Sequence, residues 1–138
     1  MYPEEFVTPI RSDLVEAGFT ELTSASDVET HLQDHKGTSL LVINSVCGCA
    51  AGAARPGIKM ALSHSPRKPE HLVTVFAGVD FEATQKAREY TLPYPPSSPS
   101  IALFKDGELV SFVERHMIEG RPAELIAEHL MGVFDEYC

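Results

Sequence analysis

The chain has 138 residues, of which 43% are hydrophobic and 22% are charged, and this composition is typical of one globular domain of ordinary size. Asp and Glu number 20 against 11 Lys and Arg, which gives a net charge of −9. This charge repels phosphate groups, so we expect neither nucleic acid nor an anionic membrane surface as a partner.

The sequence also predicts where the protein works. Its acidic start is followed by no long apolar run, so we expect no signal or transit peptide. No stretch approaches the ~18 consecutive apolar residues that a membrane-spanning helix needs. We therefore expect a cytoplasmic protein. In that reducing compartment its 3 cysteines are structural thiols, metal ligands or redox groups rather than a disulfide framework.

The first predicted element is a helix within residues 1–18, an N-terminal extension of a single domain that covers residues 1–138. Gly18 ends the run of this helix. Its apolar residues recur at helical spacing, and they are Phe6, Ile10, Leu14 and Ala17. The weak alternation over Phe19–Thr23 predicts a short strand. A capping box that begins at Ser26 predicts a second helix, to about His35.

The middle of the chain alternates between apolar runs and helical patterns. Ser39–Asn44 is nearly all apolar and partly β-branched, which predicts a strand covered on both faces. The Ala-rich stretch Cys49–Leu62 predicts a helix that Pro56 kinks. A second buried strand is expected at Leu72–Phe76.

The last third of the chain predicts a helix, a hairpin and a second helix. A helix with Asp80 as its N-cap is expected at Phe81–Tyr90. A Pro-rich loop then leads to strands at Ile101–Phe104 and Leu109–Val113, which an Asp-Gly turn joins into a hairpin. A closing helix is expected at 122–137. Strands that alternate with helices require parallel pairing with right-handed crossovers. The terminal hairpin adds antiparallel strands at one end, so the predicted fold is a mixed α/β sandwich.

The strongest chemical signal is Cys47-Gly48-Cys49, which lies where the first buried strand ends and a helix begins. Backbone N–H groups at a helix N-terminus stabilise a thiolate, and open α/β sheets place their sites at the carboxyl ends of strands. The pair therefore indicates thiol–disulfide chemistry. Two alternatives are that both are buried structural thiols, or that they bind a soft metal together with Cys138 and a histidine.

Several segments together resemble one known family. Residues 41–56, with Cys-Gly-Cys in place of the Cys-X-X-Cys of thioredoxins, are similar to the bacilliredoxin signature within the thioredoxin superfamily. Residues 97–100 resemble the loop that carries the superfamily's cis-proline. Arg115-His116 followed by residues 118–120 resembles the family's motif after the hairpin, and the terminal Cys138 has a counterpart near the family's C-terminus.

The resemblance implies a thioredoxin-like three-layer α/β/α sandwich, with a mixed central sheet and a C-terminal β-hairpin and helix. It implies a thiol–disulfide oxidoreductase that removes bacillithiol-like thiols from protein mixed disulfides or isomerises disulfides, with no tightly bound cofactor. Its partners would be S-thiolated or disulfide-containing client proteins and the small thiol. The alternative function is a metal-binding protein or a redox-sensing interaction module that uses the same cysteines.

Two departures from thioredoxin narrow the expected activity. The strand before the cysteines carries no acidic residue, and Val46 stands where thioredoxins have a tryptophan. Both argue against a broad protein-disulfide reductase. One residue between the cysteines closes a small ring, and Gly48 supplies the backbone tolerance for it. We therefore expect a pair that is more oxidising than thioredoxin.

Within the motif, Cys47 is predicted to be the attacking thiol because it precedes the helix, and Cys49 is predicted to be the resolving thiol. We expect the Ser98–Pro99 peptide to be cis, with the Ser98 backbone available to a substrate chain. Arg55 is expected to lie too far from Cys47 for a direct role.

The second hairpin strand is expected to return Arg115 and His116 to the cysteine end. There, His116 would favour a nearby thiolate or relay a proton, and Arg115 would pair with a carboxylate of the small thiol. The alternative is an ordinary surface pair in which Glu119 forms a salt bridge. Cys138 is expected to be exposed and to take no part in the reaction.

Overall fold

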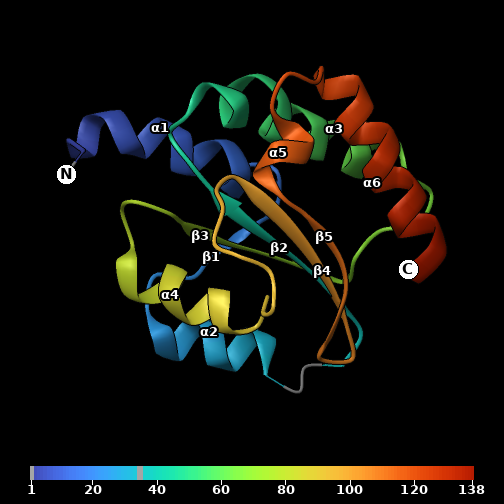
Figure 1. The fold of residues 1–138 in the computed structure, drawn as a ribbon, viewed down its shortest axis with the longest axis horizontal. Coiled ribbons are helices and arrows are strands. Elements are labelled where there is room, and N and C mark those ends of the chain that lie inside the picture. The colour runs from blue at the N-terminus through green and yellow to red at the C-terminus, as the bar shows by residue number, and fades with distance from the viewer. Residues whose placement is uncertain (1, 34–35) are drawn as a thin grey trace.

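The computed structural model of the protein describes residues 2–33 and 36–138, and its elements follow the predicted order (Figure 1). A five-stranded sheet lies between two layers of helices. The elements in chain order are α1 (Glu4–Val15), β1 (Thr20–Glu21), α2 (Ala25–Leu32), β2 (Thr38–Asn44), the π-helix η1 (Ala50–Ala54), α3 (Arg55–His64), β3 (His71–Phe76), α4 (Phe81–Glu89), β4 (Ser100–Lys105), β5 (Glu108–Val113), α5 (Arg115–Ile118) and α6 (Ala123–Tyr137).

The strand order is β1-β3-β2-β4-β5, with parallel pairing among β1, β3 and β2 and antiparallel pairing of β4 with both β2 and β5. The sheet is mixed, as predicted. The β4–β5 turn has positive φ angles of 50° at Asp106 and 84° at Gly107, which the predicted Asp-Gly hairpin requires.

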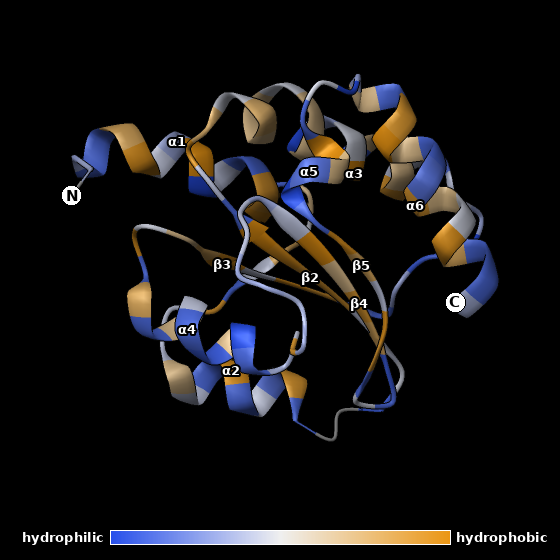
Figure 2. Cartoon of the chain, in the orientation of Figure 1, coloured by the Kyte–Doolittle hydropathy of each residue, from blue (hydrophilic) through white to orange (hydrophobic). Residues whose placement is uncertain are grey.

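The central strand β2 is buried along its whole length, and its alternation separates the core into two halves. Leu40 and Val42 face α1, α3 and α6, whereas Leu41 and Ile43 face α2 and α4. In Figure 2 the strands are the most apolar part of the fold, and polar residues gather on the outer sides of the helices. This two-sided cover explains why the run is continuously apolar rather than alternating.

Several local details differ from the sequence-based expectations. The N-cap of α2 is Ser24, which accepts a hydrogen bond from the Asp27 amide, so the predicted capping box at Ser26 is wrong. Its predicted end near His35 lies outside the described residues. Asp80 caps α4 without a side-chain hydrogen bond because its carboxylate binds Arg11 through two contacts of 2.7 and 3.0 Å.

Two residues predicted for apolar stripes are half exposed, Phe6 at 49% and Leu125 at 49%, and in α1 it is Val7 that is buried instead of Phe6. The short helix α5 was not predicted. Among the described residues, no helix has the length and apolar character to cross a membrane.

The helix predicted over residues 49–62 is in fact two segments that meet next to Pro56. The Arg55 amide donates a hydrogen bond to the carbonyl of Ala50, and this longer spacing is that of a π-turn. Pro56 lies in the first turn of α3. Proline has no amide hydrogen, so Pro56 cannot donate the α-helical hydrogen bond to the preceding turn. The change from π-helix to α-helix falls at this missing bond. The predicted irregularity is therefore confirmed in position, as a π-turn ahead of α3.

Candidate active site

Three separate segments meet at the carboxyl end of β2. Asn44 ends that strand and leads into the cysteine pair, and the antiparallel register pairs Ile43 with Ser100 at the start of β4. The hairpin register pairs Ile101 with Val113, which carries the start of α5 to the same edge. The prediction that the returning strand brings Arg115 to the cysteine end is confirmed.

Cys47 and Cys49 are both free and partly exposed, and their sulfur atoms lie 2.8 Å apart. The Cys47 carbonyl accepts hydrogen bonds from the Ala50 and Ala51 amides, so the first helical turn begins at Cys47. The nucleophile candidate thus lies at the N-terminal end of the turn, where backbone N–H groups point outward.

The surroundings drive the pKa values of the two thiols in opposite directions. Burial acts to raise the pKa of Cys47, but hydrogen bonds from the Cys49 thiol, the Ser45 hydroxyl and the amides of Ala50 and Cys49 outweigh it, so the Cys47 pKa is lowered. Burial and the neighbouring Cys47 raise the pKa of Cys49, although the Arg115 charge opposes this rise. At a given pH, Cys47 therefore carries the larger thiolate fraction.

A buried polar network that the sequence did not reveal holds the loop before Cys47. The Ser45 hydroxyl accepts a hydrogen bond from the Cys47 amide at 3.2 Å, and the Asn44 side-chain oxygen accepts one from the Ser45 amide at 2.9 Å. Arg55 donates to that same Asn44 oxygen at 2.9 Å and to the Ser45 carbonyl at 2.8 Å. Arg55 was expected to have no direct role at Cys47, and its described contacts are with the loop rather than with the sulfur, so its role is indirect.

The charge of Arg55 is balanced within the same region, where its side chain is only 7% exposed. Its Nε atom lies 3.3 Å from the Asp13 carboxylate, as an ion pair without a well-aligned hydrogen bond. Lys59 binds the second Asp13 oxygen at 2.5 Å. This ion pair links α1 to α3, and so anchors the cysteine loop to two helices.

The Ser98–Pro99 peptide is cis, as predicted. The Ser98 carbonyl is not entirely free, because the Arg115 guanidinium donates to it at 3.1 Å. The Arg115 amide also contacts the Ser97 hydroxyl at 3.4 Å, so α5 is tied directly to the cis-proline loop. A second cis peptide, Leu92–Pro93, lies earlier in the same loop and was not predicted.

Arg115 forms the salt bridge that was the alternative interpretation of this segment, and it also lies near the two cysteines. It forms an ion pair with Glu119 at 3.1 Å, and the nearby Cys49 and Cys47 thiolates raise the pKa of its guanidinium. His116 lies beside it on α5 with an exposed side chain.

Cys138 lies at the opposite end of β2, where its thiol contacts the side chain of Thr38. It is partly buried rather than exposed. Within residues 2–33 and 36–138, no group of three or more His, Cys, Asp or Glu side chains is placed to hold a metal ion. The soft-metal site that would combine Cys138 with the pair is therefore not assembled in this fold.

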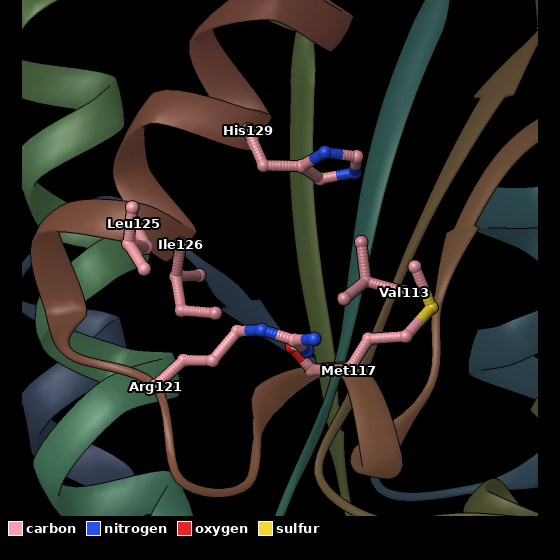
Figure 3. Close-up of a pocket in the computed structure, with 6 residues that line it drawn as sticks. All are labelled: Val113, Met117, Arg121, Leu125, Ile126 and His129. Carbon is pink, nitrogen blue, oxygen red and sulfur yellow. Dashed lines mark hydrogen bonds between the residues drawn. The ribbon is translucent and has the colours of Figure 1, made fainter.

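Two cavities lie near these elements, and only one adjoins the cysteines. A cavity of about 570 Å³ is lined by Ser45, Val46 and Ser98 on one side and by α4 on the other. A smaller one of about 270 Å³ lies between β5, α5 and α6 (Figure 3). In the smaller cavity, Arg121 donates to the Met117 carbonyl. Neither cavity is lined by a cysteine, but only the larger one is lined by the loop before Cys47 and by Ser98, so it is the one that borders the cysteine motif.

Comparison with known proteins gives consistent results. A family model described as disulphide isomerase matches residues 2–138. A bacilliredoxin of Cytophaga hutchinsonii is 65% identical over 136 residues, which cover 99% of both chains. A bacilliredoxin of Geobacillus kaustophilus is 50% identical over 137 residues, covering 99% of this chain and 94% of the relative.

Solved structures resemble this one in fold at low sequence identity. A thioredoxin from Halobacterium salinarum has a TM-score of 0.60 at 14% identity, covering 88% of this chain and 91% of its own. A Schistosoma mansoni thioredoxin has a TM-score of 0.60 at 20% identity, covering 88% and 97%. The predicted thioredoxin-like sandwich is confirmed by this likeness, which shows the fold alone.

Proposed function

This chain belongs to the bacilliredoxin family of thiol–disulfide oxidoreductases, and we propose that it removes bacillithiol-like thiols from S-thiolated client proteins through Cys47. The single observation that carries the proposal is the opposed pKa shift of the two thiols, lowered at Cys47 and raised at Cys49. Attack requires a thiolate, and release requires a second thiol held in reserve nearby.

The proposed reaction is two thiol–disulfide exchanges. The Cys47 thiolate attacks the small-thiol sulfur of the mixed disulfide, the new Cys47–small-thiol disulfide forms, and the client thiolate leaves. Cys49, which loses its proton as it attacks, then attacks the Cys47 sulfur, or a second small-thiol molecule attacks the sulfur of the bound small thiol, which releases a small-thiol disulfide and the Cys47 thiolate. In the first case, the small thiolate leaves and a Cys47–Cys49 disulfide remains, which a reducing thiol must return to the dithiol.

We propose that the backbone around Ser98 and Pro99 positions the client chain. The Ser98 carbonyl oxygen has a second lone pair besides the one that Arg115 occupies, and Pro99 donates no hydrogen bond in competition. Arg115 and His116 lie on α5 beside this loop, where their side chains would contact the client or the small thiol. The cytoplasm, with its reduced thiol pool, is the proposed setting, and bacillithiol is a co-substrate rather than a bound cofactor.

Disulfide isomerisation is a second candidate function, favoured by the description of the family model that matches residues 2–138. It uses the same first step, with a client disulfide in place of the mixed disulfide. Both functions therefore depend on the same nucleophile and differ in the sulfur that it attacks, that of the small thiol or that of the client.

Trapping tests the proposal directly. A Cys49→Ala variant, incubated with a bacillithiolated client protein, should accumulate one bacillithiol on Cys47 and release the reduced client, as read by intact-protein mass spectrometry. A Cys47→Ala variant serves as the matched control and should gain no adduct. If the adduct forms on Cys138 of Cys49→Ala or on Cys49 of Cys47→Ala, or if a client-protein adduct accumulates on Cys47, the proposed first step is wrong.

A further inference from the structure

The cavity of about 570 Å³ beside the cysteine pair differs in charge from the molecule as a whole. The chain carries a net charge of −9 and 20 acidic residues, yet no Asp or Glu is among the residues described as lining this cavity. Its only lining cation among them is Arg88 of α4. The volume lies within the ~300–1,000 Å³ typical of small-molecule sites.

Within residues 2–33 and 36–138, Arg88 has no ion-pair partner for its charge. Its Nε atom is buried without a hydrogen-bond partner, and burial lowers the pKa of the guanidinium. Among the described residues, no carboxylate forms an ion pair with it, whereas Arg11 binds Asp80 and Arg115 binds Glu119. A partly buried arginine without a partner is unfavourable by itself, and an anionic ligand that satisfies it would gain affinity for that reason.

The cavity is lined by residues that flank the cysteine pair in sequence and by the cis-proline loop. Ser45 and Val46 immediately precede Cys47, and Ser98 precedes the cis-proline. Val46 lines the cavity, and a larger side chain in its place would fill part of the space. A small thiol joined to Cys47 therefore has space on the α4 side of the motif.

Arg115, the cation that the sequence offered for carboxylate binding, is already engaged. Its Nε atom pairs with Glu119 at 3.1 Å and its Nη1 atom donates to the Ser98 carbonyl at 3.1 Å. Using Arg115 for a ligand carboxylate would mean competing with Glu119. Arg88 would need no such exchange.

We propose that this cavity binds the carboxylate-bearing part of the low-molecular-weight thiol, and that the Arg88 guanidinium is its anion contact. The proposal rests on the proposed function, because it requires a small thiol to be delivered to Cys47. It assigns the specificity for an anionic thiol to α4, on the other side of the cysteine motif from α5.

The test compares two adducts of one client protein, one with bacillithiol and one with the uncharged thiol 2-mercaptoethanol. Arg88→Met keeps the aliphatic stem and should raise KM for the bacillithiol adduct about tenfold, the effect of losing one charge-assisted hydrogen bond, with kcat within about twofold. KM for the uncharged adduct should not change. Arg88→Lys should restore part of the loss, since it keeps the charge but not the planar fork.

Lys86→Met is the matched control, because it removes one positive charge from the same helix outside the residues that line the cavity. It should change neither KM. Equal losses on both adducts in Arg88→Met would place Arg88 in client binding or in folding and overturn the proposal. Unchanged KM on both adducts would overturn it as well.

A binding measurement separates this proposal from the proposed function. S-methyl bacillithiol has no free thiol and cannot exchange, so calorimetry with it measures recognition without turnover. The unmodified chain should bind this probe about tenfold more tightly than Arg88→Met. Binding without any de-thiolation would count against the proposed function alone, whereas equal affinities or no binding by either chain would refute the Arg88 site even in an active enzyme.

Discussion

The two ends of β2 each hold a partly buried cysteine, yet the two thiols differ in their chemistry. Cys47 lies just beyond the carboxyl end, and Cys138 lies against Thr38 at the amino end. Burial raises the pKa of Cys138, and the contact with Thr38 and the charge of Lys105 do not overcome it. At Cys47, burial acts in the same direction but is overcome, so the pKa is lowered.

The difference lies in the number of hydrogen-bond donors rather than in exposure. The Cys47 sulfur lies at the first turn of a helix, where the amides of Cys49 and Ala50 favour its thiolate, and it gains the Ser45 hydroxyl and the Cys49 thiol as well. The Cys138 thiol ends a helix, where amides are already bonded within the turn. A strand-to-helix junction therefore makes a nucleophile of a cysteine that burial would otherwise keep protonated.

The largest expected effect comes from removing each thiol in turn. Cys47→Ser should abolish release of the small thiol from a labelled client protein, because no thiolate remains to attack. Cys138→Ser should leave the rate unchanged, and Cys49→Ser should keep the first exchange while stopping formation of the internal disulfide. An active Cys47→Ser chain together with an inactive Cys49→Ser chain would reverse the assignment of the two roles.

A second prediction concerns the close packing of α3 against α6. Gly57 of α3 lies against α6, and a Cβ atom there would be 2.7 Å from the Ile126 Cβ and 2.9 Å from the Ala123 carbonyl oxygen. Gly57→Ala should lower the free energy of unfolding by about 1–3 kcal/mol, because α3 and α6 would have to move apart. Urea denaturation measures the loss.

Gly52→Ala is the control for that substitution, since nothing lies within 4 Å of its added Cβ. It should leave the midpoint of unfolding nearly unchanged or raise it slightly, because alanine favours helix over glycine. Equal losses at both positions would mean that the close approach of α3 to α6 is not what makes Gly57 necessary.

A third test measures the pKa contrast itself. Alkylation by iodoacetamide follows the thiolate fraction, so its rate should reach half its maximum at a lower pH at Cys47 than at an ordinary thiol, and at a higher pH at Cys138. Ser45→Ala should move the Cys47 midpoint upward, because the hydroxyl favours the thiolate. Peptide mass spectrometry over a pH series resolves each site.

Ser26→Ala, at an exposed position on α2, controls for the loss of a serine and should leave the Cys47 midpoint where it is. A common midpoint for Cys47 and Cys138 would remove the basis for treating the two ends of β2 as chemically different.

The smallest expected effect concerns Gly48. In the dithiol its backbone does not have a positive φ, and an added Cβ would meet nothing within 4 Å, so Gly48→Ala should leave the stability of the reduced protein unchanged. Any effect must then arise in the disulfide form, where the small ring restricts the backbone. We expect a modest shift of the thiol–disulfide equilibrium toward the dithiol, measured in glutathione redox buffers.

Much of this molecule follows from local patterns in the sequence. The continuous apolar run of β2 predicted a strand covered on both faces, and the Asp-Gly turn predicted the hairpin, because burial and turn geometry act over a few residues. The Cys47-Gly48-Cys49 motif and its place at a strand-to-helix junction were likewise predicted from neighbouring residues alone. The alternation of strands and helices then required the parallel part of the sheet, and the hairpin supplied the antiparallel part.

Other features depend on residues that are distant in the sequence. The register of β4 and β5 could be followed from the hairpin, so Arg115 was correctly placed at the cysteine end. No local pattern shows that Asp13 and Lys59 flank Arg55, or that Phe6 stays exposed while Val7 is buried.

The polar residue Asn44 at the end of a fully buried strand was the one available signal for the network beneath the cysteines, since a buried amide requires partners. Which partner it finds was decided only when α3 packed over the sheet. The same holds for Arg88, an ordinary helix residue by sequence, whose unpaired charge beside the cysteine loop arises from how α4 lies against the loop that carries Ser98. Local propensity determines the elements, whereas the distances between side chains from different elements exist only in the packed fold.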